Sequence, residues 1–486
     1  MFSARTRVAG NAVLLTSAHV LGVGLSAVYS IALVRHLGPS AMGQLAIYMT
    51  MTDLAFSGLD IGITPVTLRL EAQQPEQARA IFRTALKTKA VLLSVATAIG
   101  FACAASFDVA GWDVPAVLAA TAAAAASGVA GLYVAHFKAT EHTAPVMMSA
   151  VCGGVTTALT GLALIWTKAG IAPLIFAFAL GSLVKSLTLE WHLEPGTAGP
   201  HTPATPRLSW SELIRAALPL GLSSLMHLLS VRLDTLLLGY WSTMEQVGYY
   251  NACQRILNFS QLLLDGFHGA VWPVLAHRFI HDLPGVSRVC ERIVSLSSLV
   301  SVPVALGSVY LAGPAVVLLY GSSYAPAGVV LMILGLLFAM SLEGQVYGTL
   351  MASGDDAMSW ASTAASGCGL LTMLVSTVLL VPRFGAVGSA ATLFATNAAI
   401  LLVYALYIQR RLFPIRILAP NRKGALCGLA ALAAGLALAP AHPRLAVAAA
   451  ATVYAVCVLW LAGVYADLSE VLAPFVERAR GSPPKA

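Results

Sequence analysis

The chain has 486 residues, of which 58% are hydrophobic and only 10% are charged, and its formal net charge is +7. Soluble domains carry about 25% charged residues, so charge this sparse, with a mean hydropathy of +0.81, excludes an ordinary water-soluble protein. The composition predicts an all-α integral membrane protein that crosses the bilayer many times.

The predicted spans begin near the N-terminus. MFSARTR leads into an apolar segment that lacks a convincing small-residue cleavage site, so we interpret it as a retained span. With about 20 mostly apolar residues needed for each span, we expect about fourteen transmembrane helices in all. They lie near 9–34, 42–66, 88–107, 114–135, 145–166, 171–191, 214–238, 246–276, 293–312, 326–350, 359–381, 385–408, 424–440 and 445–465.

Lysine and arginine indicate the orientation, because cytoplasmic segments carry an excess of both. If the N-terminus is cytoplasmic, 21 of the 28 lysines and arginines fall in inside segments, and the outside segments have only Arg35, Lys168, Arg383 and Arg444. A single miscounted helix would remove this asymmetry. The pattern therefore predicts that both termini are cytoplasmic.

A proline-rich stretch near the middle of the chain separates two groups of spans. Residues 192–211 have prolines at positions 195, 200, 203 and 206, which is typical of an extended linker. The sequence therefore predicts an N-terminal lobe of six helices over 1–191, this cytoplasmic linker, and a C-terminal lobe of six helices over 212–410. Residues 411–486 are two additional helices and a cytoplasmic tail.

Two stretches between spans leave alternatives open. Residues 67–89 are charged, with an apolar stripe at Ile81, Phe82 and Leu86. They fit either an amphipathic connector along the inner membrane surface or a solvated hairpin. Residues 311–320 either stand apart or extend a neighbouring helix.

The two lobes share a motif. Gly43 and Asp60 are seventeen residues apart in span two, and Gly248 and Asp265 have the same separation in span eight. In both copies a leucine precedes the aspartate, and a Pro-Val pair and an arginine follow. Both spans begin outside, so the repeat is parallel, with its axis along the membrane normal. Transporters often have this design, with the substrate site between the halves.

Three segments carry further motifs: RHLGPSAMGQLA (35–46), LDTLLLGYWSTMEQVGYYNACQRI (233–256) and LLYGSSYAPAGVVLMIL (318–334). With them, roughly residues 5–410 resemble the polysaccharide transporter (oligosaccharide flippase) family of the multidrug/oligosaccharidyl-lipid/polysaccharide exporter superfamily. An aspartate, Leu-Gly, Val-Gly-Tyr-Tyr and a following arginine are similar to that family's second-half signature. These motifs do not identify the glycan that is carried.

The resemblance implies two lobes that open alternately to either side, with spans one, two, seven and eight lining a central cavity. The cargo would be an undecaprenyl-pyrophosphate-linked oligosaccharide, moved to the outer leaflet of the bacterial inner membrane for lipopolysaccharide or exopolysaccharide synthesis. Its partners would be membrane lipids and glycan polymerase or export machinery, with no nucleic acid. No cofactor is expected, and coupling to protons, sodium ions or the membrane potential is compatible with a charged cleft.

The stretch SVRLDTLLLGYW (230–241) sets Arg232 and Asp234 inside an apolar run. A charge at the bilayer centre costs between about 2.5 and more than 10 kcal/mol, so both side chains must face protein or water. Being two residues apart, they are poor partners for each other and need neighbours on other helices. The sequence offers Arg255, Asp265 and His268 in span eight, Asp53 and Asp60 in span two, and His19 and Arg35 in span one. A guanidinium fork suits pyrophosphate, so we interpret Arg232 as a substrate contact; a gate or a helix–helix lock is the alternative.

Other charged residues within or beside the spans are also candidates. Those for the cavity, beside Arg232, are Arg255, Arg35 and Asp53, although Arg35 also fits an outward-snorkelling side chain. Those for a gate or for cation coupling are Asp234, Asp60, Asp265 and Glu343. The alternative for Asp60 and Asp265 is a helix-end ion pair with Arg69 and Arg278, and for Glu343 it is a satisfied buried carboxyl. The histidines, His136 among them, have no metal-ligand spacing and indicate core or interfacial positions.

Three other functions compete with this interpretation. A cation-coupled multidrug extruder shares the scaffold, but arginines in its cavity would disfavour cationic drugs. A peptidoglycan-precursor lipid flippase is a closer alternative, although the motifs look more like the polysaccharide branch. A membrane enzyme such as a glycan polymerase or ligase would need a large outer loop or a cluster of catalytic side chains, and the outer loops here are short. The sequence therefore predicts a transporter and not an enzyme.

Overall fold

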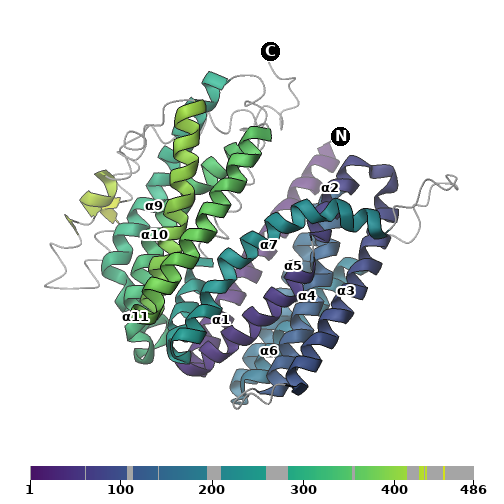
Figure 1. Ribbon diagram of the computed structural model, residues 1–486, viewed down its shortest axis with the longest axis horizontal. Coiled ribbons are helices and arrows are strands. Elements are labelled where there is room, and N and C mark those ends of the chain that lie inside the picture. The colour runs from purple at the N-terminus through teal and green to yellow at the C-terminus, as the bar shows by residue number, and fades with distance from the viewer. Residues whose placement is uncertain are drawn as a thin grey trace. The chain divides into compact units, whose positions relative to one another are not determined.

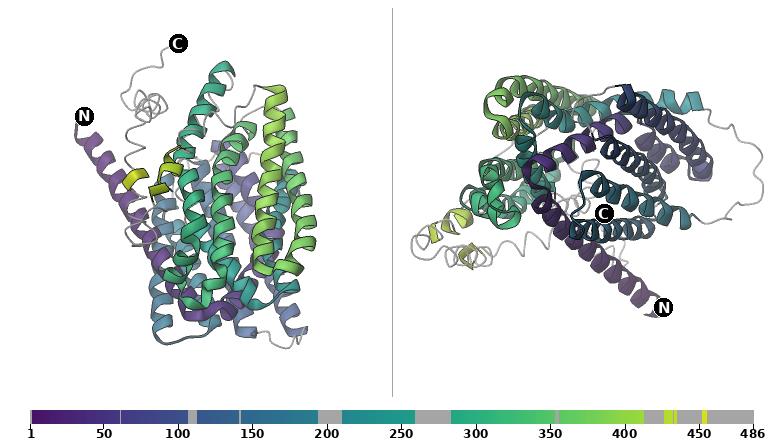
Figure 2. Two further views of the ribbon diagram at one scale, coloured as in Figure 1. Left: turned by 90° about the vertical axis from the view of Figure 1, so that its left-hand side faces the viewer. Right: turned by 90° about the horizontal axis from the view of Figure 1, so that it is seen from below.

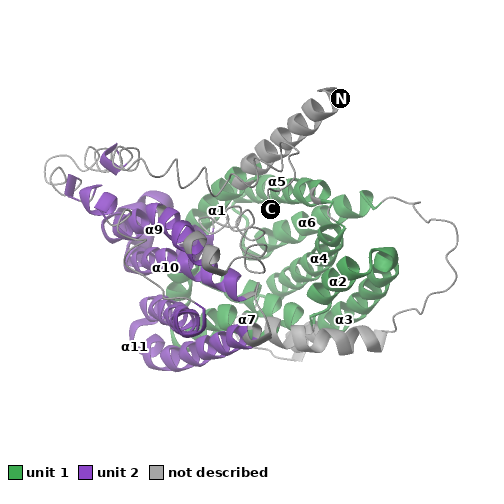
Figure 3. Ribbon diagram, turned by 90° about the horizontal axis from the view of Figure 1, so that it is seen from above, with its two compact units in different colours: residues 1–251 green, residues 252–486 purple. Residues whose placement is uncertain are grey.

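The computed structural model describes residues 2–60, 62–106, 113–140, 142–193, 210–258, 283–352 and 356–412, with short helical stretches at 426–431, 433–434 and 452–454. Helices make up its regular structure throughout these ranges. The chain divides into two compact units, residues 1–251 and 252–486 (Figure 3). This boundary differs from the linker predicted at 192–211, and the division into lobes of six helices remains a prediction.

The first unit opens with one long bent helix. Helix α1 (Phe2–Leu59) contains two predicted spans, 9–34 and most of 42–66, which meet at a single non-helical residue, Gly38, with φ 70° and ψ 174°. The second limb ends earlier than predicted. The backbone turns at Gly62, with φ 75°, and helix α2 (Ile63–Gln73) starts there.

The remaining helices of the first unit are η1 (Pro75–Gln77), α3 (Ala78–Ser106), α4 (Val114–Ala139), α5 (Thr143–Trp166), α6 (Ile171–Trp191), α7 (Trp210–Trp241) and the first turns of a helix over 244–258. Among them, α4, α5, α6 and α7 agree with predicted spans to within several residues, α3 begins ten residues before its predicted span, and η1 was not predicted. Helix α6 packs against both α4 and α5, and α5 packs against α1 (Figure 1). Helix α7 contacts α1, α2 and α3, which brings its charged stretch beside the second limb of α1.

The connector over residues 67–89 is a folded part of the first unit. Its apolar stripe is covered by protein, since Ile81 and Phe82 are 2% and 4% exposed. Phe82 packs in a core cluster with Ile63, Tyr133 and Phe137. The stripe therefore faces protein, because α2 and the start of α3 pack on α4, and the position of the connector relative to the membrane remains a prediction.

The second unit consists of α9 (Leu283–Tyr320), η2 (Ser322–Ala327), α10 (Gly328–Ala352) and α11 (Asp356–Arg411), together with the rest of helix 244–258. Helix α10 packs against α9 and α11, and Figure 2 shows these three helices, in shades of green, running alongside one another. Of the two alternatives left open for 311–320, the structure shows the extension of a neighbouring helix, because α9 continues to Tyr320. Helix α11 combines spans 359–381 and 385–408 and bends at Gly385.

Six helices within the described ranges are long and apolar enough to cross a membrane. They are Val114–Ala139, Ala144–Trp166, Ile171–Trp191, Cys290–Tyr320, Ser322–Met351 and the bent Trp360–Arg411. The total of fourteen remains a prediction. Much of spans 246–276, 424–440 and 445–465 lies outside the described residues.

Candidate functional site

Arg232 finds its partner on another helix, as its spacing from Asp234 requires. Its Nη2 lies 2.9 Å from Oδ2 of Asp53, so the pair joins α7 to the second limb of α1. Ser57, one turn along α1, donates a hydrogen bond of 3.3 Å to the other oxygen of Asp53. The two charged side chains are 43% and 41% exposed. Since a charge exposed to lipid is costly, a path filled with water beside this pair remains a prediction.

Asp234 has a different environment from Arg232, although only two residues separate them. It is 1% exposed and fully enclosed by protein. Tyr250 donates its hydroxyl hydrogen to Oδ2 of Asp234. The backbone N–H and the hydroxyl of Thr235 donate to Oδ1 over 2.5 and 3.2 Å. Buried polar groups require such partners, so here Asp234 ties α7 to helix 244–258, and its gate role remains a prediction.

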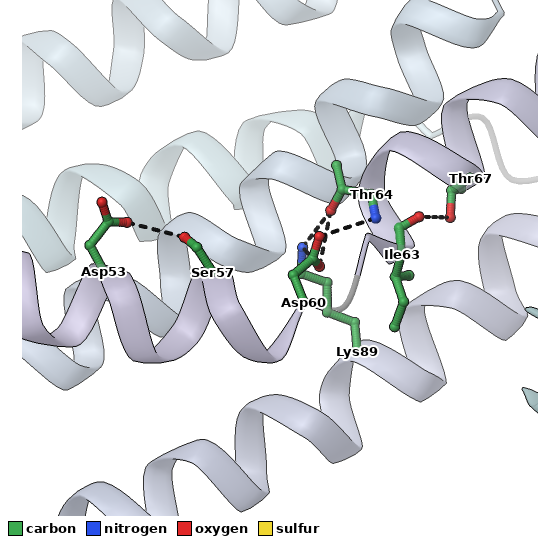
Figure 4. Close-up of polar contacts among 7 residues, drawn as sticks. All are labelled: Asp53, Ser57, Asp60, Ile63, Thr64, Thr67 and Lys89. Carbon is green, nitrogen blue, oxygen red and sulfur yellow. Dashed lines mark hydrogen bonds and ion pairs between the residues drawn. The ribbon is translucent and has the colours of Figure 1, made fainter. Parts of the chain in front are cut away.

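Asp60 lies in a second charged cluster, at the turn between α1 and α2 (Figure 4). Lys89 of α3 places its Nζ 2.7 Å from Oδ1 of Asp60 and donates to the Thr64 hydroxyl, also over 2.7 Å. The backbone N–H of Thr64 donates to Oδ2 of Asp60 over 3.2 Å, and its hydroxyl donates to Oδ1 over 3.1 Å. Asp60 thereby caps the first turn of α2.

This geometry corrects the alternative partner of Asp60. The sequence offered Arg69 for a helix-end ion pair, but the cation is Lys89, and Arg69 is exposed. The physical reason is the turn at Gly62. It starts a new helix after Asp60 and brings α3 against α2. Asp265, the repeat partner of Asp60, lies outside the described residues.

A buried pair that the sequence analysis did not single out lies at the far end of α2. Nδ1 of His136, on α4, is 2.7 Å from Oε2 of Glu71, and the two side chains are 8% and 0% exposed. Burial raises the pKa of Glu71 above its ordinary value, while the hydrogen bond and charge of His136 act in the opposite direction. The spacing of Ile63, Thr67 and Glu71 was the missed signal, since steps of four residues place all three on one helical face.

Three other predicted site residues have the following surroundings within their own units. Arg35 is exposed near the end of the first limb of α1, next to His36, whose Nε2 lies 3.1 Å from the carbonyl oxygen of Ala169. In the second unit, Arg255 interacts electrostatically with Tyr320, which donates a 3.1 Å hydrogen bond to the carbonyl oxygen of Ala252. Glu343 is half-buried on α10.

A search of the described residues for metal sites finds no group of three or more His, Cys, Asp or Glu side chains that could hold a metal ion. Among the described residues of the first unit are the open Asp53–Arg232 pair, the more enclosed Asp60–Lys89 pair and the buried hydrogen-bonded contact between His136 and Glu71.

Helices that cross a membrane around a water-exposed charge pair are characteristic of a transporter. Residues 8–279 match the family described as polysaccharide biosynthesis protein, which is more than half of the chain, and the chain belongs to this family. The Probable flippase AglR of Haloferax volcanii is 29% identical over 259 residues. That match covers 52% of this chain and 53% of the relative, so it spans about half the length of the relative.

Solved structures of two kinds of membrane transport protein share the fold. The Lipid II flippase MurJ, in an inward closed conformation, has a TM-score of 0.75 at 11% identity, over 93% of this chain and 98% of its own. An inward-facing multidrug resistance MATE family transporter of the MOP superfamily has a TM-score of 0.64 at 16% identity, over 80% and 94% of the two chains. At these identities the likeness shows the fold alone.

These findings confirm the resemblance to the oligosaccharide flippase family. They establish an all-helical, multi-pass membrane protein of the fold that MurJ and MATE transporters have. The family is one of transporters of the flippase kind and not of enzymes.

Proposed function

We propose that this protein flips an undecaprenyl-pyrophosphate-linked oligosaccharide from the inner to the outer leaflet of the bacterial cytoplasmic membrane. It does so by alternating access of two six-helix lobes, with both termini in the cytoplasm, and it supplies lipopolysaccharide or exopolysaccharide synthesis. Membership of the polysaccharide biosynthesis family and the likeness to a probable flippase support this class of cargo.

The half-exposed Asp53–Arg232 pair carries the proposal. A guanidinium can offer two parallel hydrogen bonds to a phosphate, which a lysine cannot. Asp53 occupies one side of Arg232 while the cargo is absent, and it compensates a positive charge that would be costly inside the membrane. Arriving pyrophosphate competes with this carboxylate, so the arginine keeps a partner throughout transport.

The remaining candidates complete the proposed path. Arg35 and Arg255 are further cavity contacts for the pyrophosphate or glycan. Asp234 and Asp60 are satisfied by buried partners, so a gate or coupling role for either requires an exchange of partners during the cycle. Asp265 and Glu343 remain candidates for a gate or for proton or sodium coupling.

The test is a leaflet assay in cells that lack the gene. They are complemented with the wild type, with Arg232→Ala, or with Arg83→Ala, which removes an exposed arginine from the nearby helix α3 and serves as the matched control. We expect Arg232→Ala to reach the membrane in normal amounts and to leave lipid-linked oligosaccharide in the inner leaflet. Arg83→Ala should restore surface glycan.

Other outcomes would replace the proposal. Normal surface glycan with Arg232→Ala would show that the Asp53–Arg232 pair only holds helices together. If deletion of the gene leaves glycan unchanged and alters drug tolerance, the protein is a multidrug extruder. If deletion blocks delivery of peptidoglycan precursors, it is a flippase for that lipid.

A further inference from the structure

Two glycines make an unusually close helix crossing in the first unit. A methyl group added to Gly43 of α1 would overlap the carbonyl oxygen of Met244 and lie 2.8 Å from the carbonyl carbon. A methyl group added to Gly248 would overlap the carbonyl oxygen of Pro39 and lie 2.7 Å from that carbonyl carbon. Backbone therefore lies directly on backbone here, an approach that only small residues permit.

The contact is reciprocal. Pro39 precedes Gly43 by four residues, and Met244 precedes Gly248 by four. Each glycine therefore faces the carbonyl group one helical turn before the other glycine, as an approximate two-fold axis between them requires. The sequence repeat pairs the same two glycines, each seventeen residues before an aspartate. Two independent observations thus locate the axis of the repeat at this crossing.

Side chains around the crossing exclude water. Met42, Leu45, Val247 and Tyr250 are at most 1% exposed. The end of α7 also packs closely against α1 near the crossing, since a methyl group on Gly239 would lie 2.6 Å from Cδ1 of Ile47. The buried contact between Asp234 and Tyr250 fixes α7 to helix 244–258 beside it.

Farther along α1 and α7, side chains are exposed again. Asp53 lies ten residues beyond Gly43, which is about 15 Å along α1, and its side chain is 41% exposed, like that of its partner Arg232 at 43%. In the predicted orientation the second limb of α1 enters the membrane from the outside near Gly43. The dry crossing therefore lies on the outer side of the open ion pair.

We propose that the Gly43–Gly248 crossing is the outer gate of the transport path, closed in this structure and parted when the protein faces outward. The inference rests on the proposed function for its cargo and on the predicted topology for its side. Contact between backbones fits a gate because no side chain lies between the two glycines at the crossing itself. The repeat axis fits it as well, because a path between two related halves closes where their helices meet on that axis.

The test measures access, not transport. Ser57 is exposed and lies about 21 Å along α1 from Gly43, so Ser57→Cys serves as the reporter for a membrane-impermeant thiol reagent. The reagent is added to intact cells and, separately, to inverted membrane vesicles. The parent chain without the reporter controls for the seven native cysteines.

We expect the reporter to react at least tenfold faster in inverted vesicles than in intact cells. Adding Gly43→Val or Gly248→Val should raise the labelling rate of the reporter in intact cells at least tenfold, because the valine side chain forces the two helices apart at the crossing. Gly131→Val is the matched control, since a methyl group at that helical glycine meets nothing within 4 Å. Should a valine variant fail to reach the membrane, the alanine variants take its place, because one methyl group already overlaps the facing carbonyl.

Two results would overturn the gate. One is an unchanged rate in intact cells with both glycine variants present in the membrane. The other is an increase only in inverted vesicles, which would put the crossing on the inner side. Neither readout depends on the cargo, so a failed leaflet assay with the expected labelling would reject the proposed substrate and keep the gate.

Discussion

Two carboxylates seven residues apart on the chain, Asp53 and Asp60, each pair with a cation on another helix, yet the pairs differ in every other respect. Asp53 and Arg232 are 2.9 Å apart and 41% and 43% exposed. Asp60 and Lys89 are 2.7 Å apart, 15% and 6% exposed, and Thr64 bonds to both. Distance alone therefore does not separate the two pairs, whereas exposure and a third side chain that bonds to both partners do.

The largest effect is expected from breaking the buried pair. Lys89→Ala leaves the carboxylate of Asp60 buried without its cation, which costs about 3–5 kcal/mol in the free energy of unfolding. We expect little protein in the membrane and a lower melting temperature in detergent. Lys87→Ala, which removes an exposed lysine two residues earlier, should match the wild type. Equal stability of the two variants would contradict a structural role for the Asp60–Lys89 pair.

A substitution in the exposed Asp53–Arg232 pair should lower the transport activity of the protein and leave its stability unchanged. Arg232→Lys keeps the charge but loses the planar fork, so we expect export of surface glycan to fall about tenfold or more. An exposed ion pair is worth about 0–1 kcal/mol, so membrane abundance should stay normal.

A charge exchange sharpens this prediction. Asp53→Arg combined with Arg232→Asp restores an ion pair but moves the guanidinium to the other helix. If the pair only joins helices, the double variant will export glycan normally. We expect it to remain defective, because the phosphate contact is displaced.

A smaller, pH-dependent effect is expected at Glu71. Because burial raises its pKa above 4.5, the folded state favours the protonated carboxyl. This contribution to stability is complete below pH 4.5 and is lost as the pH rises through the raised pKa. The melting temperature of Glu71→Gln should lack this decline, whereas Glu76→Gln, at an exposed position, should retain it. Identical pH profiles for wild type and Glu71→Gln would show that Glu71 does not titrate in this way.

The smallest effect is expected at Arg69. The sequence suggested this arginine as the partner of Asp60, but it is exposed and Lys89 holds that position. Arg69→Ala should therefore change the free energy of unfolding by no more than about 0.5 kcal/mol. A loss comparable to that of Lys89→Ala, measured in the same melting assay, would restore the original pairing.

Hydropathy predicted the helices well where apolar runs are separated by polar turns, and α6 was placed at 171–191 as the structure has it. It failed at the end of span two, because the turn at Gly62 follows a continuous apolar pattern. The spacing of Arg232 and Asp234 was enough to predict separate partners. Only tertiary structure shows that Asp53 is one of them and Tyr250 another.

Glu71 and Lys89 were harder to foresee. Each lies in a segment whose charged residues are typical of a solvent-exposed stretch. Both are buried only because α2 and α3 pack with α4. Such partners depend on contacts between segments far apart in the chain, which local composition does not encode. The glycine repeat was visible in the sequence, but the reciprocal contact of its two copies was not.

The bends of the two longest helices affect how a mutational scan should be interpreted. Gly38 and Gly385 have φ values of 70° and 53°, which side chains other than glycine rarely adopt. Nothing lies within 4 Å of a methyl group added at Gly38, so intolerance there would reflect dihedral strain and not crowding. Both positions will score as strongly constrained, and that signal should not be counted as evidence of contact with the cargo.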